Sequence, residues 1–126
     1  MSVLLDSHAF LWWCDGDLQL SSKARQAIEE EDCLVSVVSL WELAIKVSVG
    51  KLRLPDTIDR YFPTQMLKNG FDQLDINFRQ IARCATLPFH HRDPFDRMLV
   101  AQALEGDLTI VSRDPVFSQY GVTRIW

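Results

Sequence analysis

The chain has 126 residues, 48% of them hydrophobic, and a formal net charge of −4 at pH 7. This length predicts one domain, residues 1–126, with a core large enough to fold without disulfide bonds or a structural metal. The acidic balance excludes a broadly basic surface, so a polyanionic partner would have to bind locally. The three cysteines, Cys14, Cys33 and Cys84, fit neither a disulfide framework nor a paired metal motif, which indicates a reducing, cytoplasmic environment.

Short apolar strands and helices alternate along the first half of the chain. Val3–Leu5 predicts a buried strand that ends at Asp6. This first apolar run contains a charge and lacks a basic leader, so it is neither a signal peptide nor a membrane span. Further elements are expected as helices over Ser7–Trp13, from Ser21 or Ser22 to Glu31 and from Ser39 to Gly50, a strand over Cys33–Val37, and an irregular stretch over Lys51–Pro55.

The second half continues this alternation. Asp56 is expected to cap an amphipathic segment that Pro63 kinks or splits into two short helices before Gly70. After a strand over Leu74–Ile76, Asn77 caps a helix that carries Phe78, Ile81, Ala82 and Ala85 and ends before Leu87 and Pro88. The last elements are a helix from Asp93 to Gly106 and strands over Leu108–Val111 and Val122–Ile125. Strands this short and uniformly apolar predict a three-layer α/β/α sandwich with a mostly parallel central sheet.

Four carboxylates are placed to meet at one edge of that sheet. Asp6 and Asp114 follow the carboxyl ends of two predicted strands, while Glu42 and Asp96 lie in the first turns of two predicted helices. In open α/β sheets a ligand site forms outside the carboxyl ends of the strands. We therefore expect the four side chains to converge.

Helix-end chemistry could also explain several of these acids taken singly. Ser39 and Glu42 match a capping box, and Glu42 with Lys46 has the spacing of a helical ion pair. Asp93, which precedes a proline, is explained better as a helix N-cap than as a metal ligand. Asp96 would also be favoured by the helix dipole.

The set of acids is more informative than its members. Each pair of unit charges at 4 Å repels by about 4 kcal/mol at an effective dielectric of 20, so a converged cluster needs a cation. Oxygen ligands without cysteine or histidine at ligand spacing favour Mg²⁺ or Mn²⁺ over Zn²⁺. Such a site is suited to hydrolysis of phosphodiester bonds.

Four blocks of sequence carry a resemblance to a known family. They are VLLDSHAFLWW, SLWELAIK, HHRDPFDRMLVAQA and IVSRDPVFSQYGV, and their order and gaps cover nearly the whole chain. Together they resemble the PIN-domain ribonucleases, and most closely the VapC-type toxins of bacterial toxin–antitoxin pairs. The resemblance implies a PIN-like fold, Mg²⁺- or Mn²⁺-dependent endoribonuclease activity, an RNA substrate, a small antitoxin partner and a homodimer.

The resemblance also assigns roles to individual residues. It makes Asp6, Glu42, Asp96 and Asp114 the catalytic, metal-binding acids and Asp93 an additional metal ligand, with the division of work between Asp93 and Asp96 left open. Ser7 matches the hydroxyl residue that follows the first acid and would contact substrate. Arg92, Arg97 and Arg113 flank the acids and are candidates for phosphate contacts or, equally, solvated surface charges.

Other prominent side chains receive weaker assignments. His8, His90 and His91 are left out of the catalytic set, because a lone loop histidine is more often structural. Trp12 and Trp13 are adjacent and cannot both point inward, so the exposed one is a candidate for a groove that binds an antitoxin helix.

Two other classes of enzyme also have an aspartate after the first strand, and neither pattern is present. Aspartyl-phosphate phosphatases need a second aspartate where this chain has His8, and receiver domains need an acidic pair beside the first strand. The remaining alternative is a PIN-like module that binds RNA or protein without cleavage. The intact set of four acids argues against it, because a binding surface for phosphates has no use for unpaired carboxylates.

Overall fold

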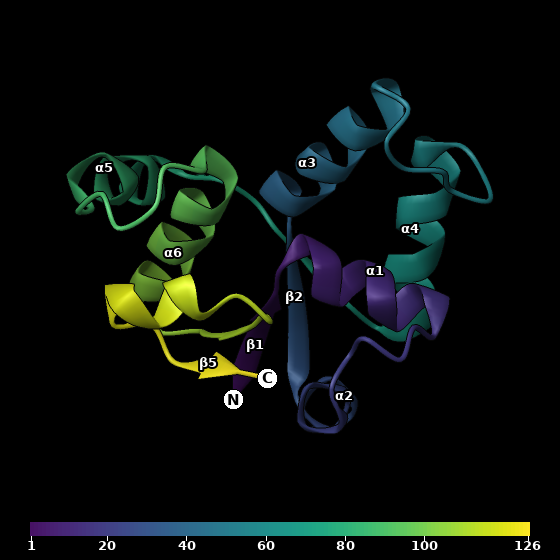
Figure 1. The fold of residues 1–126 in the computed structure, drawn as a ribbon, viewed down its shortest axis with the longest axis horizontal. Coiled ribbons are helices and arrows are strands. Elements are labelled where there is room, and N and C mark those ends of the chain that lie inside the picture. The colour runs from purple at the N-terminus through teal and green to yellow at the C-terminus, as the bar shows by residue number, and fades with distance from the viewer.

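The computed structural model describes residues 1–126 as a five-stranded sheet with helices packed on it (Figure 1). The strands are β1 (Ser2–Leu5), β2 (Asp32–Ser36), β3 (Asp72–Leu74), β4 (Thr109–Val111) and β5 (Arg124–Ile125). The helices are α1 (Ser7–Asp15), α2 (Ser22–Glu30), α3 (Val37–Ser48), α4 (Ile58–Asn69), α5 (Phe78–Thr86), α6 (Pro94–Gly106) and the short 3-10 helix η1 (Pro115–Tyr120).

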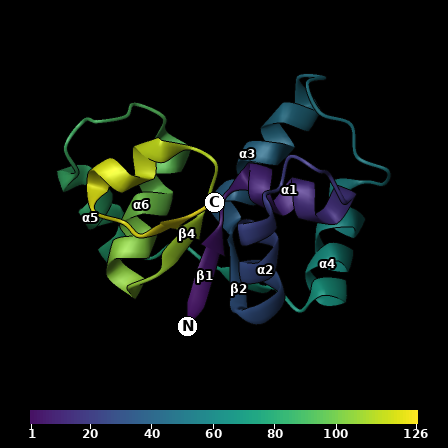
Figure 2. The same cartoon turned by 60° about the horizontal axis from the view of Figure 1, so that its bottom comes forward.

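Helices cover both faces of the sheet (Figures 1 and 2). Successive side chains of β1 point to opposite faces, so Val3 and Leu5 enter one core with residues of α1, α2 and α4. Leu4 enters the other core, with residues of α6 and η1. The predicted three-layer sandwich is therefore confirmed, and every pairing between neighbouring strands is parallel.

The strand order fixes where a ligand site can form. The order is β3-β2-β1-β4-β5, so the chain proceeds outward from β1 on one side and returns to β4 on the other. The carboxyl ends of β1 and β4 flank this switch point, where open α/β sheets bind ligands. Leu5 pairs with Val111 at the end of the ladder, and the Asp6 backbone amide donates to the Val111 carbonyl at 3.2 Å.

Helix α3 begins earlier than the sequence indicated. Ser36 is the N-cap, its hydroxyl accepting from the Val38 amide at 3.1 Å, whereas Ser39 is fully buried inside the helix. The expected capping box of Ser39 and Glu42 is thus wrong, and Glu42 lies in the second turn. The strand prediction ran one residue too far, because Val37 already belongs to the helix.

Helix α4 is one continuous helix although it contains Pro63. It is therefore not split into two short helices, and Tyr61 and Phe62, directly before the proline, are both buried in the core. The cap is also displaced, because Thr57 and not Asp56 occupies the N-cap position.

Helix α5 buries a polar residue and leaves several of its apolar residues exposed. Gln80 is buried and accepts from Gln102 of α6 at 3.2 Å, so a polar contact decides how α5 lies on α6. Phe78 and Ile81 are instead 90% and 47% exposed, and Ala82 and Ala85 are exposed as well. The predicted helix and its Asn77 cap are confirmed, but these four residues do not form its buried face.

Smaller differences concern element ends. β3 is Asp72–Leu74 and not Leu74–Ile76, and the last two strands are shorter than predicted. Gly106 is the last residue of α6, but Asp107 adopts the left-handed conformation with φ 52°. Aspartate is among the non-glycine residues that tolerate this region best.

None of the helices combines the length and the apolar composition needed to cross a membrane.

Candidate metal centre

Asp6 sits where β1 turns into α1. Its Oδ1 accepts the Ala9 backbone amide at 2.8 Å, so it caps α1, and the residue is only 7% exposed. A cap uses one carboxylate oxygen and leaves lone pairs on the other. The structural role and a ligand role are therefore compatible at this residue.

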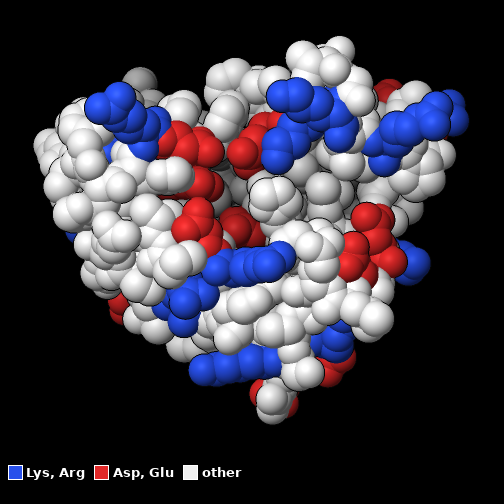
Figure 3. All heavy atoms as spheres, in the orientation of Figure 1, with Lys and Arg blue, Asp and Glu red and all other residues white.

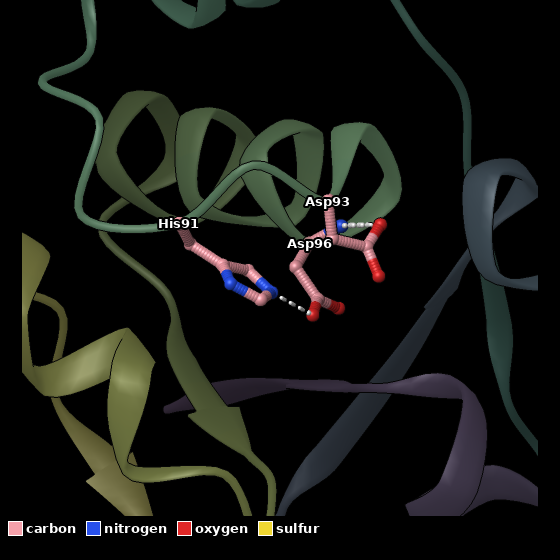
Figure 4. Close-up of side chains that lie close together, drawn as sticks. All are labelled: His91, Asp93 and Asp96. Atoms are coloured by element: carbon pink, nitrogen blue, oxygen red, sulfur yellow. Dashed lines mark hydrogen bonds and ion pairs between the residues drawn. The ribbon is translucent and has the colours of Figure 1, made fainter.

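The start of α6 brings two further carboxylates and a histidine together (Figure 4). Asp93 caps the helix, its Oδ1 accepting from the Phe95 amide at 2.9 Å, as the sequence predicted. Asp96 lies in the first turn, and its Oδ2 is 2.9 Å from Nε2 of His91. Ligand atoms of His91, Asp93 and Asp96 all lie within 4.8 Å of one another.

Glu42 and Asp114 complete the group from two other segments. Asp114 follows β4 and caps η1, its Oδ1 accepting from the Val116 amide at 3.0 Å. The Glu42 carboxylate makes no hydrogen bond or ion pair within the chain, and the expected pair with Lys46 is not formed. The structure thus gives Glu42 no structural role as a cap or an ion-pair partner.

These side chains line one hollow, which we call the acid hollow. It has a volume of about 380 Å³, and no hydrophobic residue lines it; its residues are Asp6, Ser7, His8, Glu42, Lys46, His91, Asp93, Asp96 and Asp114. Figure 3 shows acidic side chains gathered in the depression between the two halves of the molecule, with lysine and arginine side chains near its border. The expected convergence is confirmed, and the roles assigned to the residues stay predictions.

Burial and mutual repulsion act on the acids in the hollow. Burial raises the pKa of Asp6 above its ordinary value, and the Glu42 carboxylate adds to that shift. Burial also raises the pKa of Asp96 from 3.8 to about 6, the Asp93 carboxylate adds to the rise, and the contact with His91 opposes it. A cation would relieve this unfavourable accumulation of negative charge.

The raised pKa of Asp96 predicts a pH-dependent stability of the protein without metal. Between pH 3.8 and about 6 the folded state binds more protons at Asp96 than the unfolded state does, so this contribution to stability is lost as pH rises through that window. A shift of about 2 units corresponds to about 3 kcal/mol. Unfolding in a chelator across this pH range should show a smaller fall in stability for Asp96→Asn than for the parent.

The exposed Asp59 provides a matched control for this measurement. Asp59→Asn should leave the fall in stability as it is in the parent. If Asp96→Asn and the parent lose the same stability over the window, Asp96 does not carry the raised pKa.

Arg97 proves to be a buried structural residue, so its expected phosphate contact is wrong. It is 6% exposed, and its guanidinium lies 4.1 Å from the Phe89 ring centroid, away from the lining of the acid hollow. Its N–H groups donate to the backbone carbonyls of Cys84, Leu87, Pro88 and His91 and to the Tyr120 hydroxyl. Arg97 therefore fixes the loop that presents His91 to Asp96.

The other predicted contact residues lie where substrate or partner could reach them. Arg92 and Arg113 are exposed, each lining a hollow that adjoins the acid hollow. Trp12 and Trp13 are both half-buried, so the expected division into one inward and one exposed ring is not seen. Trp13 Nε1 donates to Asn69 Oδ1 at 3.0 Å, which ties it to α4.

Three residues of the acid hollow are missed by sequence reasoning. Sequence reasoning treats His8 and His91 as structural histidines and explains Lys46 by its helical spacing from Glu42. Lys46 stands one turn after Glu42 on α3 and brings the only lysine charge into the lining. The available signal was proximity in sequence, since each lies within five residues of an acid assigned to the site.

The donor set fits a hard divalent cation. Carboxylate oxygens predominate, they come from four separate segments, and burial withdraws Asp6 and Asp96 from water. Mg²⁺ and Mn²⁺ are bound by such oxygen ligands with water completing the coordination. The unpaired Glu42 provides a further free carboxylate.

Comparison with known proteins agrees with this architecture. The family model of the PIN domain matches residues 3–122. Ribonuclease VapC22 of Mycobacterium tuberculosis is 33% identical over 115 residues, which cover 90% of this chain and 87% of that protein. The chain belongs to the PIN-domain family, and the resemblance predicted from the four sequence blocks is confirmed. Within the family it is similar to a VapC-type ribonuclease.

Solved structures show the same fold at lower sequence identity. A chain of the VapBC2 structure from Rickettsia felis, bound to a promoter DNA fragment, superposes with a TM-score of 0.73 and 11% identity, covering 98% of this chain and 97% of that chain. A chain of a toxin–antitoxin complex from Klebsiella pneumoniae gives 0.61 and 18%, covering 89% and 86%. These likenesses establish the fold.

Proposed function

We propose that the protein is a divalent-metal-dependent endoribonuclease and the toxin of a toxin–antitoxin pair. The observation that carries the proposal is the acid hollow, where carboxylates from four segments meet at the switch point of the sheet. The 33% identity to a VapC ribonuclease supports RNA as the substrate. Mg²⁺ or Mn²⁺ is the cation that these ligands suit.

The residues of the hollow divide the work by their chemistry. When bound, the cation supplies positive charge that activates water and stabilises the transition state. Asp6, Glu42, Asp96 and Asp114 hold it, and Asp93 has one oxygen left after capping α6. The carboxylate least committed to the cation accepts the proton of the attacking water.

Cations and a hydroxyl around the acids bind the substrate. Lys46 lies in the hollow, and Arg92 and Arg113 lie on adjoining surfaces, so the RNA backbone has positive charge on both sides of the acids. Ser7 is buried beside Asp6 and offers a hydroxyl toward the same space.

Metal-dependent cleavage of a panel of structured RNAs, followed by mapping of the cut sites, tests this proposal. We expect internal cuts with Mg²⁺ or Mn²⁺ and none in a chelator. If the purified protein binds these RNAs but cuts none of them with either metal, the chain is a catalytically silent PIN-like binding module.

A small antitoxin is the proposed protein partner, since one solved relative is part of a toxin–antitoxin complex. We place its contact on α1, where Trp12 and Trp13 are both half-buried and Trp12 lines a hollow that adjoins the acid hollow. A basic side chain of the partner could then reach the acids and compete with the cation.

Mutation of the tryptophan doublet should weaken this complex. The short protein encoded beside this chain's gene is expected to rescue growth when co-expressed, and its pull-down should weaken with Trp12→Ala or Trp13→Ala. Removal of a buried interface tryptophan typically costs 2 kcal/mol or more, roughly a 30-fold loss of affinity. Parental affinity in both variants would place the contact elsewhere.

A homodimer is proposed through the apolar surface that α5 and α3 leave uncovered. Phe78 and Trp41 are 90% and 62% exposed, and Trp41 lines an apolar groove of about 280 Å³ together with Val38, Ile76, Cys84, Pro94, Phe95 and Met98. Burial of this surface against a second copy would remove it from water. Sedimentation should show a dimer for the parent and a monomer for Phe78→Asp, whereas a monomeric parent contradicts the proposal.

A further inference from the structure

A second hollow opens beside the acid hollow, and we call it the side hollow. Its volume is about 420 Å³, and its lining residues are Asp6, His8, Trp12, Arg113, Asp114 and Pro115. This volume lies within the range of small-molecule sites, about 300 to 1,000 Å³. Asp6, His8 and Asp114 line both hollows. If a phosphate of an RNA strand lies over the acids, the neighbouring nucleotide of that strand can therefore reach the side hollow.

An aromatic pair forms one wall of the side hollow. The rings of His8 and Trp12 are stacked, with centroids 5.3 Å apart and planes inclined by 19°. The two residues are four apart on α1, so the helix places them one above the other. His8 is exposed and leaves its ring accessible to a ligand.

The orientation of this pair is set before any ligand arrives. Trp12 packs against the first core, and the Trp126 ring lies 5.7 Å from it. Because Trp12 is held from behind and His8 stacks on it, little conformational entropy remains to be lost when a flat group binds. Such preorganisation favours affinity.

Arg113 lines the same hollow and contributes a planar cation. It follows β4, is exposed, and makes only one long side-chain hydrogen bond, from Nη1 to Gln19 Oε1 at 3.4 Å. Most of its N–H groups are therefore available. A guanidinium can stack on a base or donate to a phosphate, and sites for single-stranded nucleic acids combine such cations with aromatic platforms.

We propose that the side hollow binds the unstacked base of the nucleotide next to the scissile phosphate, with the His8–Trp12 pair as its platform and Arg113 beside it. The proposal rests on the proposed ribonuclease function and deepens it. Because every base has a π-face, this site selects an unpaired nucleotide and not a particular base. A base held in a duplex cannot enter it, so cleavage is directed to single-stranded segments.

Binding to an inactive variant tests the subsite without any need for cleavage. The background is Asp96→Asn, and the probes are a short single-stranded RNA containing all four bases and the same RNA with every base replaced by abasic ribose. Both keep the phosphate charges, so the ratio of their dissociation constants isolates the bases. Stacking of one base predicts a ratio of roughly 5- to 150-fold in favour of the intact RNA.

Three further variants in this background show where the bases bind. Trp12→Leu keeps apolar bulk against the core but removes the ring, and His8→Ala removes an exposed ring with little risk to the fold. Both Trp12→Leu and His8→Ala should lower the ratio of the two dissociation constants toward one. Trp13→Leu is the matched control, because Trp13 contacts Phe71 and Asn69 and does not line the side hollow, and it should keep the ratio of the background.

The outcomes separate the subsite from the nuclease. A ratio of one in the background, or a ratio unchanged by both His8→Ala and a folded Trp12→Leu, overturns the subsite even if the parent cleaves RNA. If the ratio is unchanged in both His8→Ala and Trp12→Leu but Trp12→Leu loses antitoxin binding, the side hollow belongs to the protein partner. A ratio that falls in both variants supports the subsite, and if the parent then cuts no RNA with Mg²⁺ or Mn²⁺, only the catalytic proposal fails.

Discussion

Asp6→Asn is expected to abolish metal-dependent RNA cleavage while the protein stays folded. Asparagine caps a helix as well as aspartate, so the Ala9 amide keeps its acceptor. The variant loses a buried negative charge that burial and Glu42 already disfavour, so stability in a chelator should be unchanged or higher. Loss of several kcal/mol of transition-state stabilisation corresponds to roughly a thousandfold or greater fall in kcat/KM.

Thermal melts and cleavage rates, measured together, show whether Asp6 acts as a metal ligand or only as a helix cap. Asp114→Asn should behave in the same way, because Asp114 caps η1 as Asp6 caps α1. The exposed Asp59→Asn serves as a matched control and should retain parental activity. Unfolding of both site variants well below the parent in a chelator would show that these acids are structural caps.

Glu42→Gln should lower kcat/KM by roughly a hundredfold or more with no loss of fold. The Glu42 carboxylate forms no hydrogen bond or ion pair within the chain, and glutamine has nearly the same shape, so the substitution removes no side-chain contact. The change removes only the charge that a hard cation prefers in its ligands. Cleavage assays over a series of Mg²⁺ and Mn²⁺ concentrations should show that half-maximal activity requires a higher metal concentration and that the maximal rate is lower.

The exposed Glu29→Gln on α2 controls for the loss of one negative charge from an acidic chain. It should keep the parental rate and metal dependence. Near-parental activity in Glu42→Gln would remove Glu42 from the site and leave the cation to the aspartates.

The edge of the sheet that carries the site could be predicted because it depends on local patterns. A short apolar run followed by an aspartate marks a strand end, and parallel strands bring such ends together. Asp6 and Asp114 were found in this way. Asp93 was identified as a cap from its proline neighbour, since that signal also lies within a few residues.

Contacts between distant segments could not be predicted in the same way. The sequence shows Arg97 among acids, but its burial depends on four carbonyls from the end of α5 and the loop after it. The inward face of α5 depends on the contact of Gln80 with Gln102. The carbonyls that bind Arg97 and the contact between Gln80 and Gln102 can be identified only once the packing of α5 on α6 is known.

The predicted start of helix α3 is about one turn too late, and this affects how Glu42 is interpreted. The start of α3 was placed at Ser39 because its spacing to Glu42 imitates a capping box, whereas Ser36 caps the helix three residues earlier. Both serines follow apolar residues, and local sequence does not decide between them. The correct start removes the structural explanation of Glu42 and leaves its carboxylate free.

The acids of the hollow belong to both layers of helices. Asp6 begins α1, which packs in one core, and Asp96 lies on α6, which packs in the other. A cation bound by both would connect the two helix layers at the carboxyl ends of the strands. At a concentration 100 times its Kd, it would raise the free energy of unfolding by about 2.7 kcal/mol. Cellular proteases attack the unfolded state, so the lifetime of the protein would follow the supply of divalent cation as its activity does.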